Sequence, residues 1–147
     1  MKNILIITLA ICTLSLTFCG SKRTNVAFLD PLNEVRKEFE SRGIKVVNFT
    51  PINFGPLNEA GTCHRRPWGN WIEINEKFWN SFNKTAKKYL LAHEIGHCML
   101  DRDHDDEMIE FHGIAAPKSI MHSTSSLAAE AALGLGANEY YFDELLN

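Results

Sequence analysis

Two histidines four positions apart, His93 and His97, constrain this chain more than any other feature of its sequence. On an α-helix, residues i and i+4 lie about 40° apart around the axis, so both imidazoles project from one face. At that spacing two imidazole nitrogens can bind one zinc ion at about 2.0–2.1 Å. Glu94 follows the first histidine, where a carboxylate can contact a metal-activated water without binding the metal. The segment 93–97 therefore predicts a helix that carries two zinc ligands and one general base.

Short helices and strands are expected around this motif. Helical spacing of apolar residues, β-branched runs and turns rich in Pro and Gly indicate their positions. We expect a helix over 30–41 with Asp30 as its N-cap, a strand over 44–49, a loop over 51–61, two strands within 62–74 separated by a turn at 67–70, the motif-bearing helix from Asn83 or Thr85 to Leu100, and a closing helix over 138–146. This mixture predicts one α+β domain with a short mixed sheet.

The N-terminus has the composition of an export signal. A positively charged Lys2 precedes an apolar run over 4–18, which is too short for a bilayer span. The run ends in LTFCGS, which resembles the lipobox of bacterial lipoproteins, although Phe18 departs from the small residue usual before the cysteine. We expect a lipoprotein-type signal peptide over 1–18, lipidation at Cys19 and a tether over 19–29. Plain secretion and a retained membrane anchor stay open, and all three alternatives export the domain.

Because lipid would occupy Cys19, Cys63 and Cys98 are the two cysteines left to form one disulfide in an exported domain. Cys98 lies about 100° around the helix from His97, away from the metal side. The alternative is that Cys98 is simply a small buried apolar residue.

Composition limits the partners of this chain. Its 147 residues, 45% hydrophobic and 22% charged, suit one globular domain. A net charge of −3 and the acidic run over 101–107 give no electrostatic basis for binding nucleic acid. We expect a monomer that meets a peptide or protein substrate and touches a membrane only through its N-terminal lipid.

A catalytic zinc needs a third protein ligand and one open position. The sequence continues as HEIGHCMLDRDH and later as PKSIMH over 117–122. This pattern resembles the metzincin clan of zinc endopeptidases, whose signature HExxHxxGxxH is followed by a Met-containing turn beneath the metal. The resemblance covers about the second half of the chain. It implies a small zincin-like metallopeptidase domain over 30–147, zinc as cofactor, and Met121 as a support that does not bind the metal.

The chain departs from this pattern at two positions. Asp103 stands where the third histidine is expected, and Leu100 stands where the pattern has glycine. A turn longer by one residue would place Asp101 in the left-handed conformation, which Asp tolerates, and deliver His104 to the zinc. The alternative is unchanged spacing with Asp103 as the ligand, which would force Leu100 into that conformation at a cost of about 1–2 kcal/mol. We favour His104.

These observations predict an exported zinc endopeptidase in which Glu94 is the general base for a metal-activated water. The resemblance further implies that a strand over 60–66 borders the substrate cleft and that residues 122–124 wall one of its pockets. Two alternatives stay open. One is a zincin with a distant glutamate, such as Glu130, as third ligand, and the other is a zinc-containing surface lipoprotein that acts as a binding or adhesion module without catalysis.

Overall fold

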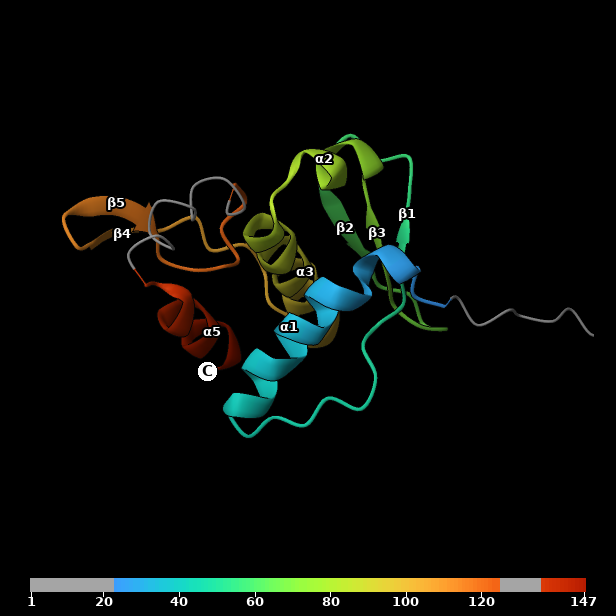
Figure 1. The fold of residues 1–147 in the computed structure, drawn as a ribbon, viewed down its shortest axis with the longest axis horizontal. Helices are drawn as coiled ribbons and strands as arrows, with labels where there is room; N and C mark the ends of the chain where they lie inside the picture. The colour runs from blue at the N-terminus through green and yellow to red at the C-terminus, as the bar shows by residue number, and fades with distance from the viewer. Residues whose placement is uncertain (1–22, 125–135) are drawn as a thin grey trace, which may run out of the picture.

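A three-stranded mixed sheet lies along one side of a central helix (Figure 1). The computed structural model describes residues 23–124 and 136–147, which form an α+β fold. The sheet order is β1 (Ile52–Phe54), β3 (Trp71–Ile74), β2 (Gly61–His64). β1 is parallel to β3 and β2 is antiparallel to it, so β2 is an edge strand. The expected mixed sheet and the two strands within 62–74 are confirmed, with β2 beginning one residue earlier.

Four α-helices and a hairpin complete the described fold. The helices are α1 (Leu29–Ser41), α2 (Glu76–Ser81), α3 (Lys84–Met99) and α5 (Asn138–Leu146). The hairpin pairs β4 (Met108–Phe111) with β5 (Ile114–Pro117). In Figure 1 the large sheet stands on one side of α3, whereas the hairpin and α5 stand on the other. The motif-bearing helix and the closing helix are therefore confirmed. Among the described residues, no helix is long and apolar enough to cross a membrane.

The core forms where α1, α3, α5 and the large sheet meet. Alternate residues of the strands face inward, as a half-buried sheet requires, and each helix contributes one apolar face. Fully buried members include Ile52, Ile72 and Ile74 from the sheet, Val35 and Phe39 from α1, Leu91 and Ile95 from α3, and Tyr141 and Phe142 from α5. Phe28, within the expected tether, is also fully buried, so the packed domain begins before residue 30.

The expected N-cap role of Asp30 is wrong. A 3₁₀ turn, η1 (Val26–Phe28), leads directly into α1, and the Asn25 side chain caps that turn by accepting from the Ala27 N–H at 3.0 Å. α1 begins at Leu29 with no side-chain cap, and Asp30 lies in its first turn. There its negative charge favours the positive end of the helix dipole.

The expected strand over 44–49 is also wrong, because no strand in the described part of the chain pairs with it. Val46 is buried and its carbonyl accepts from the Arg36 guanidinium, while Val47 is exposed. The strand forms instead at Ile52–Phe54, in the expected loop, where β3 offers a parallel partner. A β-branched run has the composition of a strand, but a strand forms only where the tertiary structure supplies a pairing partner.

The hairpin β4–β5 and α2 were missed. Both carry a local signal in the sequence. His112 and Gly113 take positive φ angles of 50° and 82° in a two-residue loop, the conformation that a tight hairpin turn requires. Asn75 caps α2 by accepting from the N–H groups of Lys77 and Phe78.

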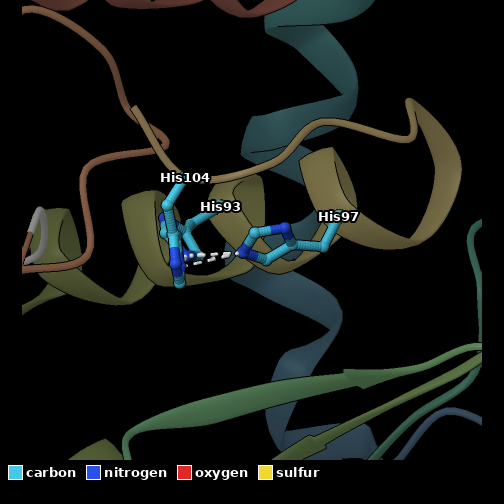
Figure 2. Close-up of side chains that lie close together, drawn as sticks. All are labelled: His93, His97 and His104. Atoms are coloured by element: carbon cyan, nitrogen blue, oxygen red, sulfur yellow. Dashed lines mark hydrogen bonds between the residues drawn. The ribbon is translucent and has the colours of Figure 1, made fainter. Parts of the chain in front are cut away.

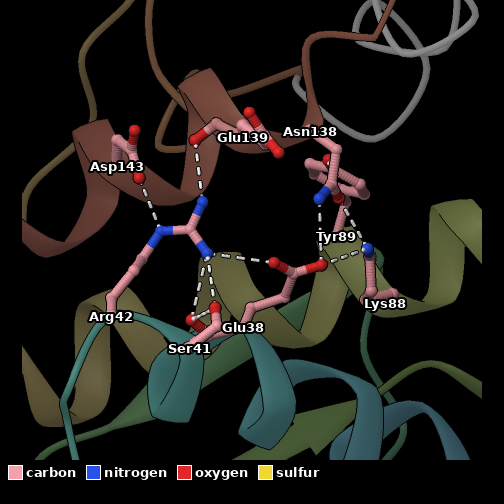
Figure 3. Close-up of polar contacts among 8 residues, drawn as sticks. All are labelled: Glu38, Ser41, Arg42, Lys88, Tyr89, Asn138, Glu139 and Asp143. Atoms are coloured by element: carbon pink, nitrogen blue, oxygen red, sulfur yellow. Dashed lines mark hydrogen bonds and ion pairs between the residues drawn. The ribbon is translucent and has the colours of Figure 1, made fainter.

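A polar network binds α5 to α1 and α3 (Figure 3). Arg42, which follows α1, donates to the carboxylate of Asp143 at 2.6 Å. Glu38 accepts from Lys88 of α3 at 3.1 Å and from the amide of Asn138 at 2.9 Å. Three helices far apart in sequence are thereby held together at one point.

Candidate metal centre

Two of the site's side chains come from the second half of α3. The Asn83 side chain accepts from the Ala86 N–H at 2.9 Å and so starts this helix, which then runs to Met99. His93 and His97 project from one face, as their spacing predicts. His93 is buried and His97 is half-buried. The helix therefore supplies a pair of imidazoles at the boundary between core and solvent.

The chain reverses direction at the end of α3. Leu100 is the C-cap with φ −107°, and Asp101 takes the left-handed conformation with φ 55°. The Arg102 N–H then donates back to the Gly96 carbonyl at 3.0 Å. The expected left-handed conformation of Asp101 is confirmed. Leu100 keeps a negative φ and avoids the strain of a left-handed conformation. Because of this turn, the following segment passes back over the face that carries the histidines.

His104 completes a triangle of imidazole nitrogens (Figure 2). The Nε2 atoms of His93 and His97 are 3.1 Å apart, those of His97 and His104 3.2 Å, and those of His93 and His104 3.3 Å. Three nitrogens bound to one tetrahedral ion at about 2.0–2.1 Å are about 3.3–3.4 Å apart. These three histidines can therefore bind a metal ion. Asp103 lines the adjacent cleft but does not belong to this triangle.

Backbone carbonyls orient the two helical imidazoles. The Nδ1 atom of His93 donates to the Ile120 carbonyl at 2.8 Å, and that of His97 donates to the Arg102 carbonyl at 2.7 Å. Since a carbonyl only accepts, the proton of each neutral ring is on Nδ1 and the lone pair is on Nε2. This is the arrangement in which imidazoles bind metals.

Burial keeps both helical imidazoles neutral. It lowers the pKa of His93 to about 4, and it lowers the pKa of His97 as well. Two Nε2 lone pairs therefore point toward one small region, which His104 also enters. Neutral imidazoles converging in this way repel one another unless a cation lies among them, so the donor set fits a metal.

Glu94 presents a carboxylate beside the histidines. It is buried, and burial together with the nearby charge of Glu59 raises its pKa to about 8, while the Cys63 backbone N–H opposes that rise. Within the described residues, its Oε2 atom is buried and has no hydrogen-bond partner. Gly61 of β2 makes room for it, because a Cβ there would lie 2.6 Å from Glu94 Oε1. A buried, unsatisfied oxygen at a cleft indicates a group that awaits a ligand.

A cleft of 680 Å³ opens over the histidines and Glu94. One wall is β2 with the residues that flank it, and the other is α3 with the turn that follows it. Its lining residues are Glu59, Ala60, Gly61, Thr62, Cys63, Arg65, Leu90, His93, Glu94, His97, Asp103, His104 and Ser123. The strand expected to border the cleft over 60–66 is thus β2 with its flanks. Of the expected wall over 122–124, Ser123 lines the cleft whereas His122 and Thr124 do not.

Met121 is fully buried beneath α3. A Cβ built on Gly96 would collide with its sulfur, so the methionine packs directly against the helix between the two histidine positions. Its N–H donates to the Ser119 hydroxyl at 2.9 Å, which shapes the turn that presents the Ile120 carbonyl to His93. Met121 therefore packs under the helix segment that carries the histidines, and its supporting role for a metal stays a prediction.

Cys63 and Cys98 form a disulfide, with their Cα atoms 5.5 Å apart. The bond joins the edge strand β2 to the end of α3, so the two walls of the cleft are covalently linked. Cys98 is also buried, so it is both a disulfide partner and a small buried residue, the two alternatives that the sequence left open.

Other predicted residues are not part of the described site. Cys19 and Glu130 fall outside the described residues, as does the expected signal peptide. His64 pairs with Glu73 at 3.0 Å and stacks on Trp71, away from the triangle. Sequence reasoning missed the two carbonyls that orient the imidazoles, because every residue has a carbonyl and only the fold selects these.

Comparisons with protein-family models, with curated proteins and with solved structures gave no match.

Proposed function

We propose that this protein is an exported zinc-dependent endopeptidase. The observation that carries the proposal is the triangle of Nε2 atoms of His93, His97 and His104, 3.1 to 3.3 Å apart, next to the buried and unpartnered Oε2 of Glu94. Three neutral nitrogen ligands with one open side and an adjacent carboxylate are what a hydrolytic zinc site requires.

The proposed chemistry assigns separate tasks to these residues. When bound, a zinc ion supplies the Lewis acidity that lowers the pKa of a water molecule and polarises the scissile carbonyl. The three histidines hold the ion, and the carbonyls of Ile120 and Arg102 hold two of them in position. In its ionised form, Glu94 takes the proton of the attacking water at its free oxygen and delivers it to the leaving amine. The Cys63 N–H holds the Glu94 carboxylate against β2.

The shape of the cleft favours an extended peptide as substrate. β2 is an edge strand, and its residues Gly61, Thr62 and Cys63 line the cleft. An edge strand can pair its backbone with an extended chain, which would place a peptide bond across the histidines. Leu90, about one turn before His93 on α3, adds an apolar side chain to the lining of the cleft.

The Cys63–Cys98 disulfide supports export, because such bonds persist mainly in oxidising compartments. Together with the lipobox-like segment before Cys19, it supports a domain held to the outer side of a bacterial membrane by a lipid, or secreted in its absence.

The enzymatic proposal is tested with Glu94→Gln. Zinc content and hydrolysis of a mixed peptide library are measured for the wild type, for this variant and for Glu110→Gln, an exposed glutamate of β4 away from the cleft. We expect one zinc per chain in all three and loss of hydrolysis in Glu94→Gln alone. Zinc in the wild type without hydrolysis of any peptide would contradict the proposal and favour a binding or adhesion module.

The ligand set is tested by comparing His104→Ala with Asp103→Ala. These neighbours differ in that only His104 belongs to the nitrogen triangle. We expect His104→Ala to lose zinc at a chelator concentration that leaves Asp103→Ala loaded. The reverse result would assign the third ligand to Asp103.

A further inference from the structure

Glu144, in the last turn of α5, is bound by two segments of the metal centre at once. The Arg102 guanidinium donates to its Oε1 atom, and the Ser119 hydroxyl donates to its Oε2 atom at 2.6 Å. The same guanidinium donates to the backbone carbonyls of Glu144 and Leu145 at 3.0 and 3.1 Å. Those carbonyls lie at a helix end, where no intrahelical donor remains. Arg102 therefore caps α5 while pairing with its carboxylate.

The two segments that Glu144 binds are the ones that orient the histidines. Arg102 itself provides the carbonyl that accepts from His97 Nδ1. Ser119 directly precedes Ile120, whose carbonyl accepts from His93 Nδ1. One carboxylate thus connects the supports of both helical imidazoles. The Arg102 and Glu144 side chains are 29% and 18% exposed, so this ion pair is partly shielded from solvent.

Further contacts of α5 strengthen the same connection. The Tyr140 hydroxyl donates to the Lys118 carbonyl at 2.8 Å, and the Tyr141 hydroxyl donates to the Pro117 carbonyl at 2.9 Å. Both carbonyls immediately precede Ser119. α5 therefore holds the strand end before the Met-containing turn as well as the turn itself.

We propose that Glu144 is a positioning residue for the metal ligands, and that through it the C-terminal helix clamps the metal centre. The inference rests on the proposed zinc site. Without this carboxylate, the segment at Arg102 and the turn at Ser119 lose their common anchor. The two carbonyls then hold the imidazoles less firmly, and the free protein is less well organised to receive an ion. Loss of such outer partners typically weakens metal affinity about 10- to 100-fold.

The test measures zinc affinity by competition with a chromophoric chelator in four full-length proteins. These are the wild type, Glu144→Gln, the milder Ser119→Ala, and Asp143→Asn as a matched control. Asp143 is the neighbouring acid on α5, and its side chain pairs with Arg42 rather than with Arg102 or Ser119. We expect about 10- to 100-fold weaker zinc binding in Glu144→Gln, a smaller loss in Ser119→Ala, and no change in Asp143→Asn. The visible spectrum of the cobalt-substituted protein should change in the first two variants only.

Two results would overturn the proposal. One is wild-type zinc affinity in both Glu144→Gln and Ser119→Ala, and the other is an equal loss in Asp143→Asn, which would indicate general loosening of α5. A metal-free measurement separates this inference from the zinc proposal. The Nδ1 protons of His93 and His97 should exchange with solvent faster in Glu144→Gln than in the control, as followed by NMR. If the wild type binds no zinc, the zinc proposal fails, while this exchange comparison still supports or overturns the positioning role.

Discussion

Reduction of the Cys63–Cys98 bond should destabilise the protein by a calculable amount. The bond closes a loop with a sequence separation of 35 residues, between the edge strand and the end of α3. Its removal enlarges the set of conformations open to the unfolded chain, whereas the folded chain keeps both side chains in place. The stabilisation therefore acts mainly through the unfolded state.

Loop length sets the expected magnitude. For a separation of 35 residues, the chain-entropy relation gives a loss of about 13 cal/mol/K, or about 4 kcal/mol at 25 °C. This is a large part of the about 5–15 kcal/mol that stabilises a typical domain. With a urea m-value of about 1–3 kcal/mol/M, the midpoint of unfolding should fall by about 1–4 M.

Urea unfolding of the oxidised and reduced protein, followed by circular dichroism, measures this difference. Reduction removes no heavy atom from either cysteine, so no cavity from a truncated side chain contributes. The double variant Cys63→Ala/Cys98→Ala, measured with and without reductant, is the control and should not respond. The m-value of the wild type should rise on reduction, because the uncrosslinked unfolded chain exposes more surface.

A loss below about 1 kcal/mol would refute the entropic reasoning. It would mean that the unfolded chain already holds β2 near α3 without the bond. A loss of the expected size with an unchanged m-value would instead place the effect in the folded state.

Three further predictions concern Glu94 and the glycines around it. Gly61→Ala places a Cβ 2.6 Å from Glu94 Oε1, so hydrolysis should fall about 100-fold with zinc retained; normal activity would show that the carboxylate has no fixed position. Gly96→Ala gains about 1 kcal/mol of helix propensity but overpacks the buried Met121 by about 1–3 kcal/mol. Its melting temperature should therefore drop by several degrees, and a rise would refute the packing argument. The pKa of Glu94 is about 8 in the folded protein and 4.5 ordinarily, so the folded protein binds the Glu94 proton more tightly than the unfolded chain does. Stability of the metal-free protein relative to Glu94→Gln should thus fall as pH rises from 4.5 through 8, and a pH-independent difference in unfolding free energy would contradict it.

Local sequence patterns predicted the elements that are stabilised by their own residues. The Asn83 cap and the helical spacing of α3 are local, as are the turn at 67–70 and the left-handed Asp101. By contrast, the run over 44–49 has strand composition but no pairing partner, and the short β1 forms where β3 supplies one. The hairpin at His112 and Gly113 had a readable turn signal that the sequence reasoning did not use.

The sequence by itself determined that two imidazoles share a helix face, with Glu94 beside them and His104 within reach of a one-residue-longer turn. Helical periodicity, together with the tolerance of Asp for the left-handed conformation, is enough to predict these positions. Only the tertiary structure decided how the imidazoles are held. The Ile120 carbonyl that orients His93 lies 27 residues away in sequence, and the Glu144 carboxylate lies 42 residues from Arg102, its partner. Backbone carbonyls carry no sequence signal, and the contacts of Glu144 with Arg102 and Ser119 form only when α5 packs in the folded chain.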